Sequence, residues 1–501
     1  MIFMNETLPP LIRSLLASPC EVGTTGQIEL VETHISWVLL VGDVAYKIKK
    51  ALRLPFLDFS TLERRRARCQ DELRLNRRFA PDLYLDVVAI TDGTHGPQFG
   101  GSGTPIEYAV KMRRFDENGR LDHVLSRGEL RSEHLSDLAD AVVAFHATAA
   151  VMPSTSRFGM PTQVMAPALD NFQHLARLLP NARIRARLDA LHAWTEAQFK
   201  QLAPLMEARK RGGRIRECHG DLHLANLVLI DQRVRMFDCL EFNEDLRCID
   251  VASEIAFTYI DLLDHGQPGL ANWFIDEVFG HNGDYEGALM LRFYAVYRAL
   301  VRAKVEAIRA DQTHSDTGEA VTYIVLAEHL ASPPLPQLVI TYGLAGCGKT
   351  VASTRLLQTD PHGSTLRLRS DVERRRIFGI SGTQKSGAKL NAGIYVPDAH
   401  ARTYDHLRER AEMLLKAGWS VIVDAAFLKR ADRDHFHGLA NEVCATFGIL
   451  APKATAAQLR ERILARQDLG RDASEATLDV LAQQMRRIEP LDADEKKHLL
   501  G

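Results

Sequence analysis

One short segment, 343–350, restricts the possible folds of this chain more than any other. Its sequence is GLAGCGKT, and it lies between an apolar segment at 338–342 and the start of a predicted helix at 351–357. A glycine-rich turn between a strand and a helix aims successive backbone N–H groups and the helix N-terminus at one small space that suits phosphate oxygens. The segment has the form of a Walker A loop, and it predicts an α/β domain with a parallel sheet that binds ATP.

The residues of this loop have separate expected roles. Lys349 is expected to place its ammonium group at the outer phosphates, and the Thr350 hydroxyl is expected to bind Mg²⁺. Backbone N–H groups of the other six residues are expected to line the phosphate site: Gly343, Leu344, Ala345, Gly346, Cys347 and Gly348. The loop thus predicts ATP and Mg²⁺ as cofactors.

A second phosphate-handling pattern, of unrelated design, lies upstream. Phosphoryl transfer needs a base near the acceptor hydroxyl, oxygen ligands for magnesium, and a lysine for the non-transferred phosphates. The segment 219–226, HGDLHLAN, contains Asp221 and Asn226, and Asp238 follows at the end of a predicted strand. We expect Asp221 to take the hydroxyl proton, and Asn226 and Asp238 to bind the metal. The alternatives are that these residues only cap turns, or that the site binds nucleotide without turnover.

The lysine of this second pattern is expected on an upstream strand. Residues 28–50 alternate like strands, and Lys47 lies in the last of them. Glu72, on a charged helix expected from 60 to 79, is its expected ion-pair partner. Lys49 is an alternative because its side chain points to the same face of the strand. We favour Lys47.

These residues give the chain a family resemblance. Residues 30–310 resemble the aminoglycoside phosphotransferase and choline kinase group of kinase-like enzymes, especially a bacterial subfamily in which such a domain is fused to an ATP-binding domain. The segments 32–37, 56–63 and 237–242 carry the closer match. The resemblance implies an α+β bilobal domain that transfers the γ-phosphate of ATP to a hydroxyl of a small molecule. One departure is Cys239, which stands where protein kinases have a glycine.

The C-terminal part offers further candidate residues. Asp371 ends a predicted strand and is followed by Arg374, while Asp424 ends another and could bind the metal. Arg462 and Arg466 lie four residues apart on one predicted helix face, as in a lid that donates arginines to the transferring phosphate; a solvated face is the alternative. This order resembles the gluconate kinase, polynucleotide 5′-kinase and zeta-toxin group of P-loop kinases. The resemblance implies that Asp371 is the base for the acceptor hydroxyl and Arg374 a substrate contact.

Consecutive prolines mark the expected boundary between the two parts. The segment 332–336, SPPLP, cannot continue a helix and predicts a stiff linker. We therefore expect a kinase-like domain at 1–331, with an N-lobe to about residue 111 and a C-lobe from about residue 112. A P-loop kinase-like domain is expected at 337–501, and we expect the two parts to fold separately.

Composition excludes some partners and compartments. A net charge of −2, with 46% hydrophobic and 25% charged residues, gives no reason to expect attraction to nucleic acid or a membrane. No apolar run approaches the roughly 20 residues that span a bilayer, and no signal-peptide pattern is present. The seven cysteines are scattered, without a Cys-x-x-Cys pair, which favours reduced thiols. We expect a cytoplasmic protein with small-molecule partners, and the oligomeric state stays open.

Two questions about the acceptor stay open at this level. Residues 241–290 contain eleven Asp or Glu residues and one basic residue, Arg247. We interpret this run as a solvated helical face; the alternative is an acidic pocket that attracts an amino-bearing acceptor. The leading hypothesis is a bifunctional small-molecule kinase. The alternatives are one catalytic site gated by the other as a nucleotide sensor, or a polynucleotide 5′-end kinase in the P-loop part.

Overall fold

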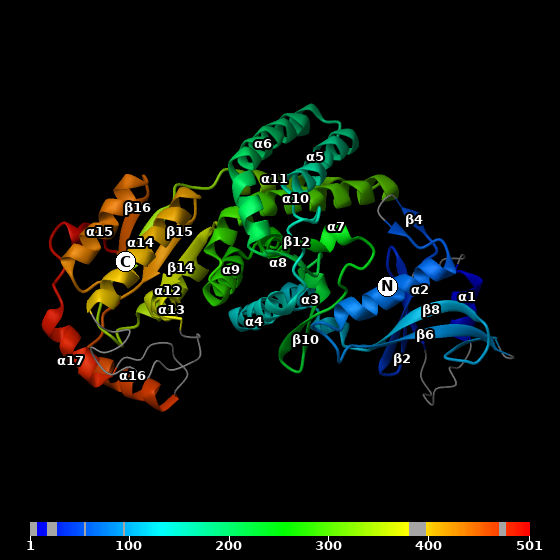
Figure 1. Cartoon of the computed structure of the whole chain (residues 1–501), viewed down its shortest axis with the longest axis horizontal. Helices are drawn as coiled ribbons and strands as arrows, with labels where there is room; N and C mark the ends of the chain where they lie inside the picture. The colour runs from blue at the N-terminus through cyan, green and yellow to red at the C-terminus, as the bar shows by residue number, and fades with distance from the viewer. Residues whose placement is uncertain are drawn as a thin grey trace. The chain divides into compact units, whose positions relative to one another are not determined.

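The computed structural model describes residues 8–17, 28–54, 57–93, 96–379, 397–469 and 477–500 (Figure 1). The chain divides into two compact units. The first contains Met1–Leu130, Ala144–Gln163 and Leu205–Glu254, and the second contains Arg131–Val143, Val164–Pro204 and Ile255–Gly501. Among the described elements, four helices contribute residues to both units: α4 (Ser132–Thr148), α5 (Pro161–Leu178), α6 (Ala182–Arg211) and α8 (Val251–Asp264).

An antiparallel sheet of six strands, in the order β1-β2-β3-β8-β6-β7, forms the base of the first unit. The strands are β1 (Glu29–Glu32), β2 (Ser36–Val41), β3 (Val44–Lys49), β6 (Tyr84–Gly93), β7 (Gly96–Phe99) and β8 (Pro105–Arg113). The helices packed on this sheet are α1 (Pro10–Ala17) and α2 (Leu62–Asn76). The strands predicted between residues 28 and 50 are confirmed.

The two helices lie on opposite faces of this sheet. α1 packs on the face that carries Tyr46, whereas α2 packs on the face that carries Ala45. Side chains alternate between the faces of a strand, so Lys47 and Lys49 share the face of Ala45. The alternation therefore points both lysines toward α2.

Short elements carry the remaining segments of the first unit. They are β4 (Arg53–Leu54), β5 (Leu57–Asp58), η1 (Glu117–Gly119), α3 (Leu121–Ser126), β9 (Ile215–Glu217), η2 (Leu224–Asn226), β10 (Leu227–Ile230), β11 (Arg233–Met236), α7 (Glu244–Arg247) and β12 (Cys248–Asp250). β10 pairs with β11, and β12 pairs with β9, both antiparallel. In the sequence, the segment 218–226 lies between β9 and β10, so each of the two strand pairs adjoins one of its ends.

The second unit contains a parallel sheet of four strands in the order β14-β15-β13-β16. The strands are β13 (Gln337–Thr341), β14 (Thr365–Arg369), β15 (Ser420–Asp424) and β16 (Thr446–Leu450). Its other elements are α9 (Pro268–Asn282), α10 (Tyr285–Thr313), α11 (Gly318–Ala331), α12 (Lys349–Gln358), α13 (Ser370–Ile377), α14 (Pro397–Lys416), α15 (Arg430–Glu442), α16 (Ala456–Leu469), α17 (Leu478–Arg487) and η4 (Glu495–His498). The predicted combination of a kinase-like α+β fold and a parallel P-loop fold is confirmed.

Helices from before the proline-rich segment pack against this parallel sheet. α9 lies along the edge strand β14, as Figure 1 shows. The Tyr259 hydroxyl donates a hydrogen bond to the Gly363 carbonyl at 2.7 Å, and the buried Trp419 indole donates one to the Ala288 carbonyl at 3.0 Å. The second compact unit thus begins well before 332–336, unlike the separation expected at that segment. The predicted domain boundaries stay a prediction.

The acidic run at 241–290 is not a solvated face, so that interpretation is wrong for most of its members. Six of the eleven carboxylates are buried: Glu241, Asp250, Glu254, Asp261, Asp276 and Asp284. Asp250, for example, accepts two hydrogen bonds from Arg209 at 2.7 and 2.8 Å. Burial of these carboxylates requires partners, and several of the partners lie in the two candidate sites.

A few local features also differ from expectation. The charged helix expected from 60 to 79 is the shorter α2, and Thr61 caps it by accepting a hydrogen bond from Arg64 N. The glycine-rich tract 96–103 begins with strand β7, which pairs with β6. No helix in the described part of the chain is long and apolar enough to cross a membrane.

Candidate functional sites

Two buried lysines of β3 share one carboxylate of α2. Lys47 Nζ lies 2.9 Å from Glu72 Oε1 and also contacts the Asp238 carboxylate. Lys49 Nζ lies 2.6 Å from Glu72 Oε2 and also contacts Glu241. The structure therefore joins Lys47 to the predicted metal ligand, and Lys49 to a deeper carboxylate that the sequence did not single out.

The charges in this cluster depend on one another. Burial by itself would lower the pKa of Lys47, but the nearby Asp238 and Glu72 raise it well above its usual value. Burial would raise the pKa of Glu72, but the two lysines bring it down to about 2. Burial and the charge of Glu72 raise the pKa of Glu241. Lys47 and Glu72 are therefore both charged near neutral pH.

A single buried carboxylate holds the backbone before Asp221. Glu254 accepts hydrogen bonds from His219 N at 2.6 Å and from Gly220 N at 2.9 Å. Gly220 has a φ of 87°, and a Cβ there would lie 3.0 Å from the Leu246 carbonyl oxygen, so this position requires glycine. Burial would raise the pKa of Glu254, but His146, the His219 imidazole and the Gly220 N–H lower it. The ionised carboxylate thus fixes the approach to Asp221.

The structure brings Asp221 and Asn226 together. Asn226 Nδ2 donates to the Asp221 backbone oxygen at 2.9 Å and lies 3.3 Å from Asp221 Oδ2. The Asn226 carbonyl accepts from Phe237 N at 3.0 Å, which ties Asn226 to the residue before Asp238. Asp238 has a φ of 62°, and its N–H donates to the Tyr84 hydroxyl at 2.9 Å. A non-glycine residue in this left-handed conformation is uncommon and recurs at functional sites.

Oxygen ligands for a hard cation are therefore present at this site. Carboxylate and amide oxygens are what Mg²⁺ prefers, and Asp238 and Asn226 supply them. The Asp221 side chain is 38% exposed, so an acceptor could reach it. The catalytic role of Asp221 and the metal-binding roles of Asn226 and Asp238 stay predictions.

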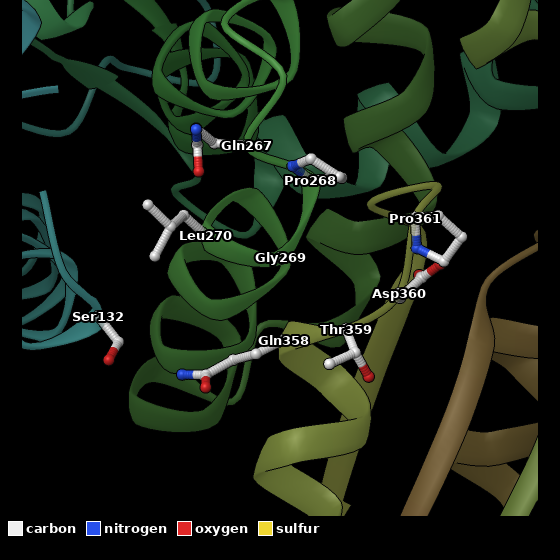
Figure 2. A pocket seen from close by; sticks show the side chains of 9 residues that line it. All are labelled: Ser132, Gln267, Pro268, Gly269, Leu270, Gln358, Thr359, Asp360 and Pro361. Carbon is white, nitrogen blue, oxygen red and sulfur yellow. The ribbon is translucent and has the colours of Figure 1, made fainter. Parts of the chain in front are cut away.

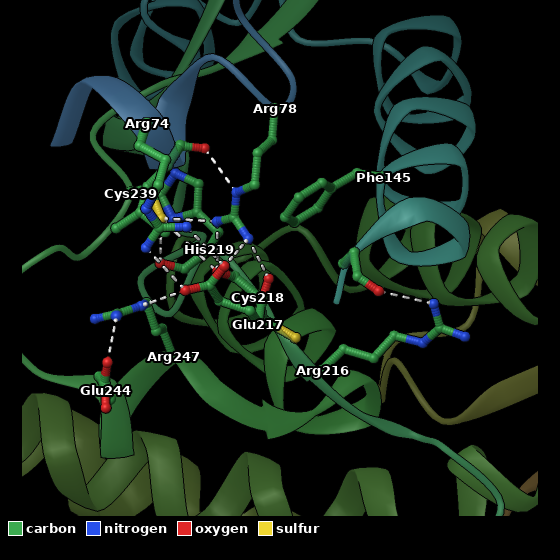
Figure 3. Close-up of polar contacts among 12 residues, drawn as sticks. Arg74, Arg78, Phe145, Arg216, Glu217, Cys218, His219, Cys239, Glu244 and Arg247 are labelled. Atoms are coloured by element: carbon green, nitrogen blue, oxygen red, sulfur yellow. Dashed lines mark hydrogen bonds and ion pairs between the residues drawn. The ribbon is translucent and has the colours of Figure 1, made fainter. Parts of the chain in front are cut away.

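Figure 3 shows an arginine network that the sequence did not reveal. Arg74 and Arg247 each approach the Glu217 carboxylate at 3.2 Å. Arg78 lies 3.2 Å from the same carboxylate and donates to the Cys218 carbonyl at 3.1 Å. Burial would raise the pKa of Glu217, but the surrounding arginines lower it. The network fastens α2, which carries Glu72, to the strand that leads into His219.

A group of three buried residues under this loop also has the composition of a metal site. Single ligand atoms of His146, Cys218 and Glu254 lie within 4.8 Å of one another. Both Glu254 oxygens already accept N–H groups of the loop, and burial raises the pKa of the Cys218 thiol well above its usual range. We therefore interpret this group as support for the loop.

In the second unit, the phosphate loop follows β13 and ends at the N-terminus of α12. Gly346 and Gly348 have φ angles of 82° and 98°, and a Cβ at Gly346 would lie 2.9 Å from the Leu459 carbonyl oxygen. Lys349 Nζ donates to the carbonyl oxygens of Gly343 and Leu344, each at 2.9 Å. These hydrogen bonds place the Lys349 ammonium group beside the backbone of the loop, where the predicted phosphate site requires it.

Asp424 lies beside the start of α12. Its Oδ2 accepts from Ser353 Oγ at 3.1 Å, and its Oδ1 lies 3.4 Å from Thr341 Oγ1. Ser353 Oγ is also 3.0 Å from the Thr350 carbonyl oxygen, so a single hydroxyl connects Asp424 to the loop threonine. This is the place where a carboxylate could bind a metal held by Thr350.

The remaining predicted residues lie near the carboxyl end of β14 or on α16. Asp371 does not end the strand as predicted: β14 ends at Arg369, and Asp371 is the second residue of α13. Its carboxylate accepts from Arg369 Nη2 at 3.1 Å, and Arg374 Nε donates to Thr403 Oγ1 at 3.4 Å. Arg462 Nη1 donates to the Gly346 carbonyl at 3.3 Å, so this arginine lies on the phosphate loop. The side chain of Arg466 lies outside the described residues. The roles of these residues stay predictions.

Helix α17 supplies a loop contact that the sequence did not indicate. Gln484 Oε1 accepts a hydrogen bond from Ala345 N at 2.7 Å. Apolar residues of α16 and α17 pack on the same loop in one cluster, formed by Ala345, Cys347, Leu459, Ile463 and Leu481. Only the amphipathic pattern of α17 could have suggested that this helix packs on a partner, because Gln484 belongs to no motif.

A separate pocket of about 310 Å³ opens elsewhere in the second unit, as Figure 2 shows. Its lining residues are Ser132, Gln267, Pro268, Gly269, Leu270, Gln358, Thr359, Asp360 and Pro361. No predicted site residue lines it, and none of its side chains forms a charged cluster suited to a phosphate or a metal.

Comparison with known proteins gives matches to both parts. Residues 338–491 match a family model described as an AAA domain. The chain is 28% identical over 460 residues to uncharacterised proteins of Mycobacterium bovis and Mycobacterium tuberculosis, covering 91% of this chain and 89% of each relative.

Solved structures of two kinds are similar to the chain. A choline/ethanolamine kinase family protein from Mesorhizobium loti has a TM-score of 0.43 and 15% identity, covering 64% of this chain and 94% of that one. A gluconokinase from Sinorhizobium meliloti has a TM-score of 0.24 and 18% identity, covering 34% of this chain and 82% of that one. These are the kinds of protein that the sequence resemblance named, and the fold assignment stands on the elements described above.

The shared carboxylate predicts different effects for the two lysines. Lys49→Met leaves Glu241 buried without its lysine contact and leaves Glu72 with Lys47 alone, and we expect it to lower the free energy of unfolding by about 3–5 kcal/mol. Lys47→Met leaves Glu72 paired with Lys49, and we expect a smaller loss. Urea denaturation of both full-length variants measures this difference. A larger loss for Lys47→Met would contradict it.

The loop geometry predicts a sharp effect at Gly346. Gly346→Ala places a methyl group against the Leu459 carbonyl in a left-handed conformation, so we expect ATP affinity at the second site to fall by at least ~10-fold. Gly438→Ala is the matched control, because a Cβ at Gly438, within α15, meets no atom within 4 Å. ATP titration with the first site disabled by Asp238→Ala measures both; equal affinity in the two variants would refute the phosphate-loop assignment.

Proposed function

We propose that this chain is a bifunctional ATP-dependent phosphotransferase with an alcohol group as acceptor in its first reaction. The observation that carries the proposal is the position of Lys47, which contacts both Glu72 and Asp238. Lysine, its carboxylate partner and the metal-binding carboxylate are three of the parts that phosphoryl transfer requires. Asp221 and Asn226 lie together on the adjoining loop and complete the set.

In the first site, some residues bind the nucleotide and its metal, and Asp221 acts on the acceptor. Asp238 and Asn226 would hold Mg²⁺, which neutralises charge on the phosphates when it is bound. Lys47, held in place by Glu72, positions the non-transferred phosphates. Asp221 accepts the proton of the acceptor hydroxyl. Glu254 keeps the backbone before Asp221 fixed, so that the carboxylate needs little reorganisation.

In the second site, the P-loop residues hold a second ATP. The phosphate loop 343–348 and the N-terminus of α12 surround the phosphates, although the Ala345 N–H donates to Gln484 in this structure. Lys349 turns from its carbonyl partners to the outer phosphates. Thr350 and Asp424 would hold Mg²⁺. Asp371 serves as base for the acceptor hydroxyl and Arg374 contacts the substrate. Arg462, already on the loop, stabilises the transferring phosphate, and Arg466 is proposed as a second lid arginine.

The acceptor of the first site is proposed to be a sugar, an amino sugar or an aminoglycoside-like molecule. Most acids of 241–290 are buried and paired, so they do not support the acidic-pocket idea; the support for this class is the sequence resemblance. We propose a cytoplasmic location and small-molecule partners, without a membrane partner or nucleic acid. A nucleotide sensor in the second unit is the alternative, and the Gln484 contact with Ala345 N favours it because that N–H lies at the nucleotide loop.

The base assignment gives a direct test. In a Lys349→Ala background, which removes the second site, we expect Asp221→Asn to lower ATP-dependent phosphorylation of a sugar and amino-sugar panel by at least ~10³-fold while ATP with Mg²⁺ still binds. Asp245→Asn is the matched control, because Asp245 is an exposed acid of the same unit whose partner is Arg157 at 2.9 Å. Undiminished turnover in Asp221→Asn would refute the role of Asp221.

The same background distinguishes the two hypotheses about the second site. If both sites are enzymes, Lys349→Ala alone leaves first-site turnover within about 2-fold of the parent. Loss of first-site turnover in Lys349→Ala, with the circular dichroism spectrum unchanged, favours the nucleotide sensor instead.

A further inference from the structure

Helix α9 takes the place of a neighbouring strand at the edge of the parallel sheet. Among the described strands β14 lies at the edge of the sheet, so no described strand accepts from its outward N–H groups. Asn272 Oδ1 accepts from Thr365 N at 3.0 Å, and Asp276 Oδ1 accepts from Arg367 N at 2.7 Å. Four residues of a helix rise roughly 6 Å, close to the roughly 6.6 Å between alternate residues of a strand, so one helix face can satisfy both groups.

Both residues also connect to α12, but at different places. Asn272 Nδ2 donates to the Leu357 carbonyl, near the C-terminal end of that helix, at 3.0 Å. Asp276 Oδ2 also accepts from Arg367 Nη2 at 3.0 Å, and the Arg367 side chain is buried. Arg367 Nη1 donates to Thr354 Oγ1 at 2.7 Å and reaches Ser353 Oγ at 3.5 Å. Thr354 and Ser353 belong to α12, the helix that starts at the phosphate loop. The Asp276 contact therefore continues into the nucleotide site.

The chain of contacts ends at the predicted metal ligands. Ser353 Oγ lies 3.1 Å from Asp424 Oδ2 and 3.0 Å from the Thr350 carbonyl oxygen. A hydroxyl has one proton to donate, and a guanidinium N–H that approaches its oxygen directs that proton away, toward these acceptors. Arg367 thus sets the orientation of Ser353, and through it the position of the Asp424 carboxylate.

The charge of Asp276 keeps Arg367 in this position. Burial raises the pKa of Asp276 above its usual value, but its contacts with Arg367 oppose that rise. Without Asp276, Arg367 would be a buried cation with hydroxyl partners and the more distant Glu277, 3.9 Å away. A buried charge without a partner is costly, so Arg367 would then shift toward another carboxylate. The Asp424 carboxylate is separated from Arg367 only by the Ser353 hydroxyl.

We propose that Asp276 is a positioning residue for the magnesium site of the P-loop. It holds Arg367, which orients Ser353 and so places Asp424 against the metal that Thr350 binds. The proposal rests on the proposed nucleotide-binding function of the second unit. It assigns part of that site to a helix that precedes the proline-rich segment.

The test uses the full chain with the first site disabled by Asp238→Ala. Mg²⁺ is titrated into the protein with saturating ATP, and ATP is titrated separately in EDTA. For Asp276→Asn we expect the apparent Kd for Mg²⁺ to rise about 10-fold, as is typical when a residue that orients a metal ligand is lost, and the Kd for ATP in EDTA to change less than 2-fold. Asn272→Ala is the control, since it removes the neighbouring edge contact, together with the Asn272 bonds to the Leu357 carbonyl and to Asp360, and leaves the path to Asp424 intact.

A second variant keeps the proposal testable if Asp276→Asn does not fold. Ser353→Ala breaks the path without touching α9, and we expect the same selective rise in the Kd for Mg²⁺. In the double variant the rise should be no larger than in either single variant, because both changes interrupt one path.

Two outcomes overturn the inference alone. One is an unchanged Kd for Mg²⁺ in Asp276→Asn and Ser353→Ala; the other is an equal rise in Asn272→Ala, which would indicate a general effect of the helix contact. If the parent shows no ATP binding that Lys349→Ala removes, the proposed function of the second unit fails, and the inference fails with it.

Discussion

The buried Glu72 carboxylate, shared by two lysine ammonium groups, is the interaction on which the first unit depends. Removing charges from water is costly unless partners and hydrogen bonds replace the solvent, so β3, α2 and the segment 238–241 must meet in one arrangement. Lys47 reaches Asp238, and Lys49 reaches Glu241. The sheet, the helix and the predicted metal loop are thereby fixed together, and the arginines around Glu217 add a second attachment between α2 and the loop that carries Asp221.

A similar principle organises the second unit, although the groups are different. A parallel sheet with four strands leaves β14 with unpaired N–H groups, and α9 supplies Asn272 and Asp276 to accept from them. The same carboxylate binds Arg367, which connects the edge of the sheet to α12. The Asp276 carboxylate, which accepts from a backbone N–H of β14, is thus also connected to the nucleotide loop. In both units, buried charges link the element that supports the site to the residues expected to carry the chemistry.

The sequence predicted what depends on local order. The phosphate loop at 343–350 and the strand that carries Lys47 follow from spacing and alternation, and the structure places Asp221 beside Asn226. The sequence did not predict the roles of Glu254, Gln484 or Asp276. Each of these side chains accepts hydrogen bonds from backbone N–H groups far away in the chain, and no short pattern identifies such a partner. The acidic run at 241–290 shows the same limit. Eleven acids with a single basic residue among them resemble a solvent-exposed surface, while partners such as Arg209 and Arg367 lie outside the run.

The position of α9 has a consequence for any shortened form of this protein. A chain that began at residue 337 would lack α9 and would present β14 with its outward N–H groups uncovered. An open edge of this kind pairs readily with the edge of another molecule, which leads to sheet-to-sheet association and loss of solubility. The proline-rich segment marks the change from α11 to β13, and α9 lies on its N-terminal side. A shortened form that keeps this edge of the sheet covered must include α9, which begins at Pro268.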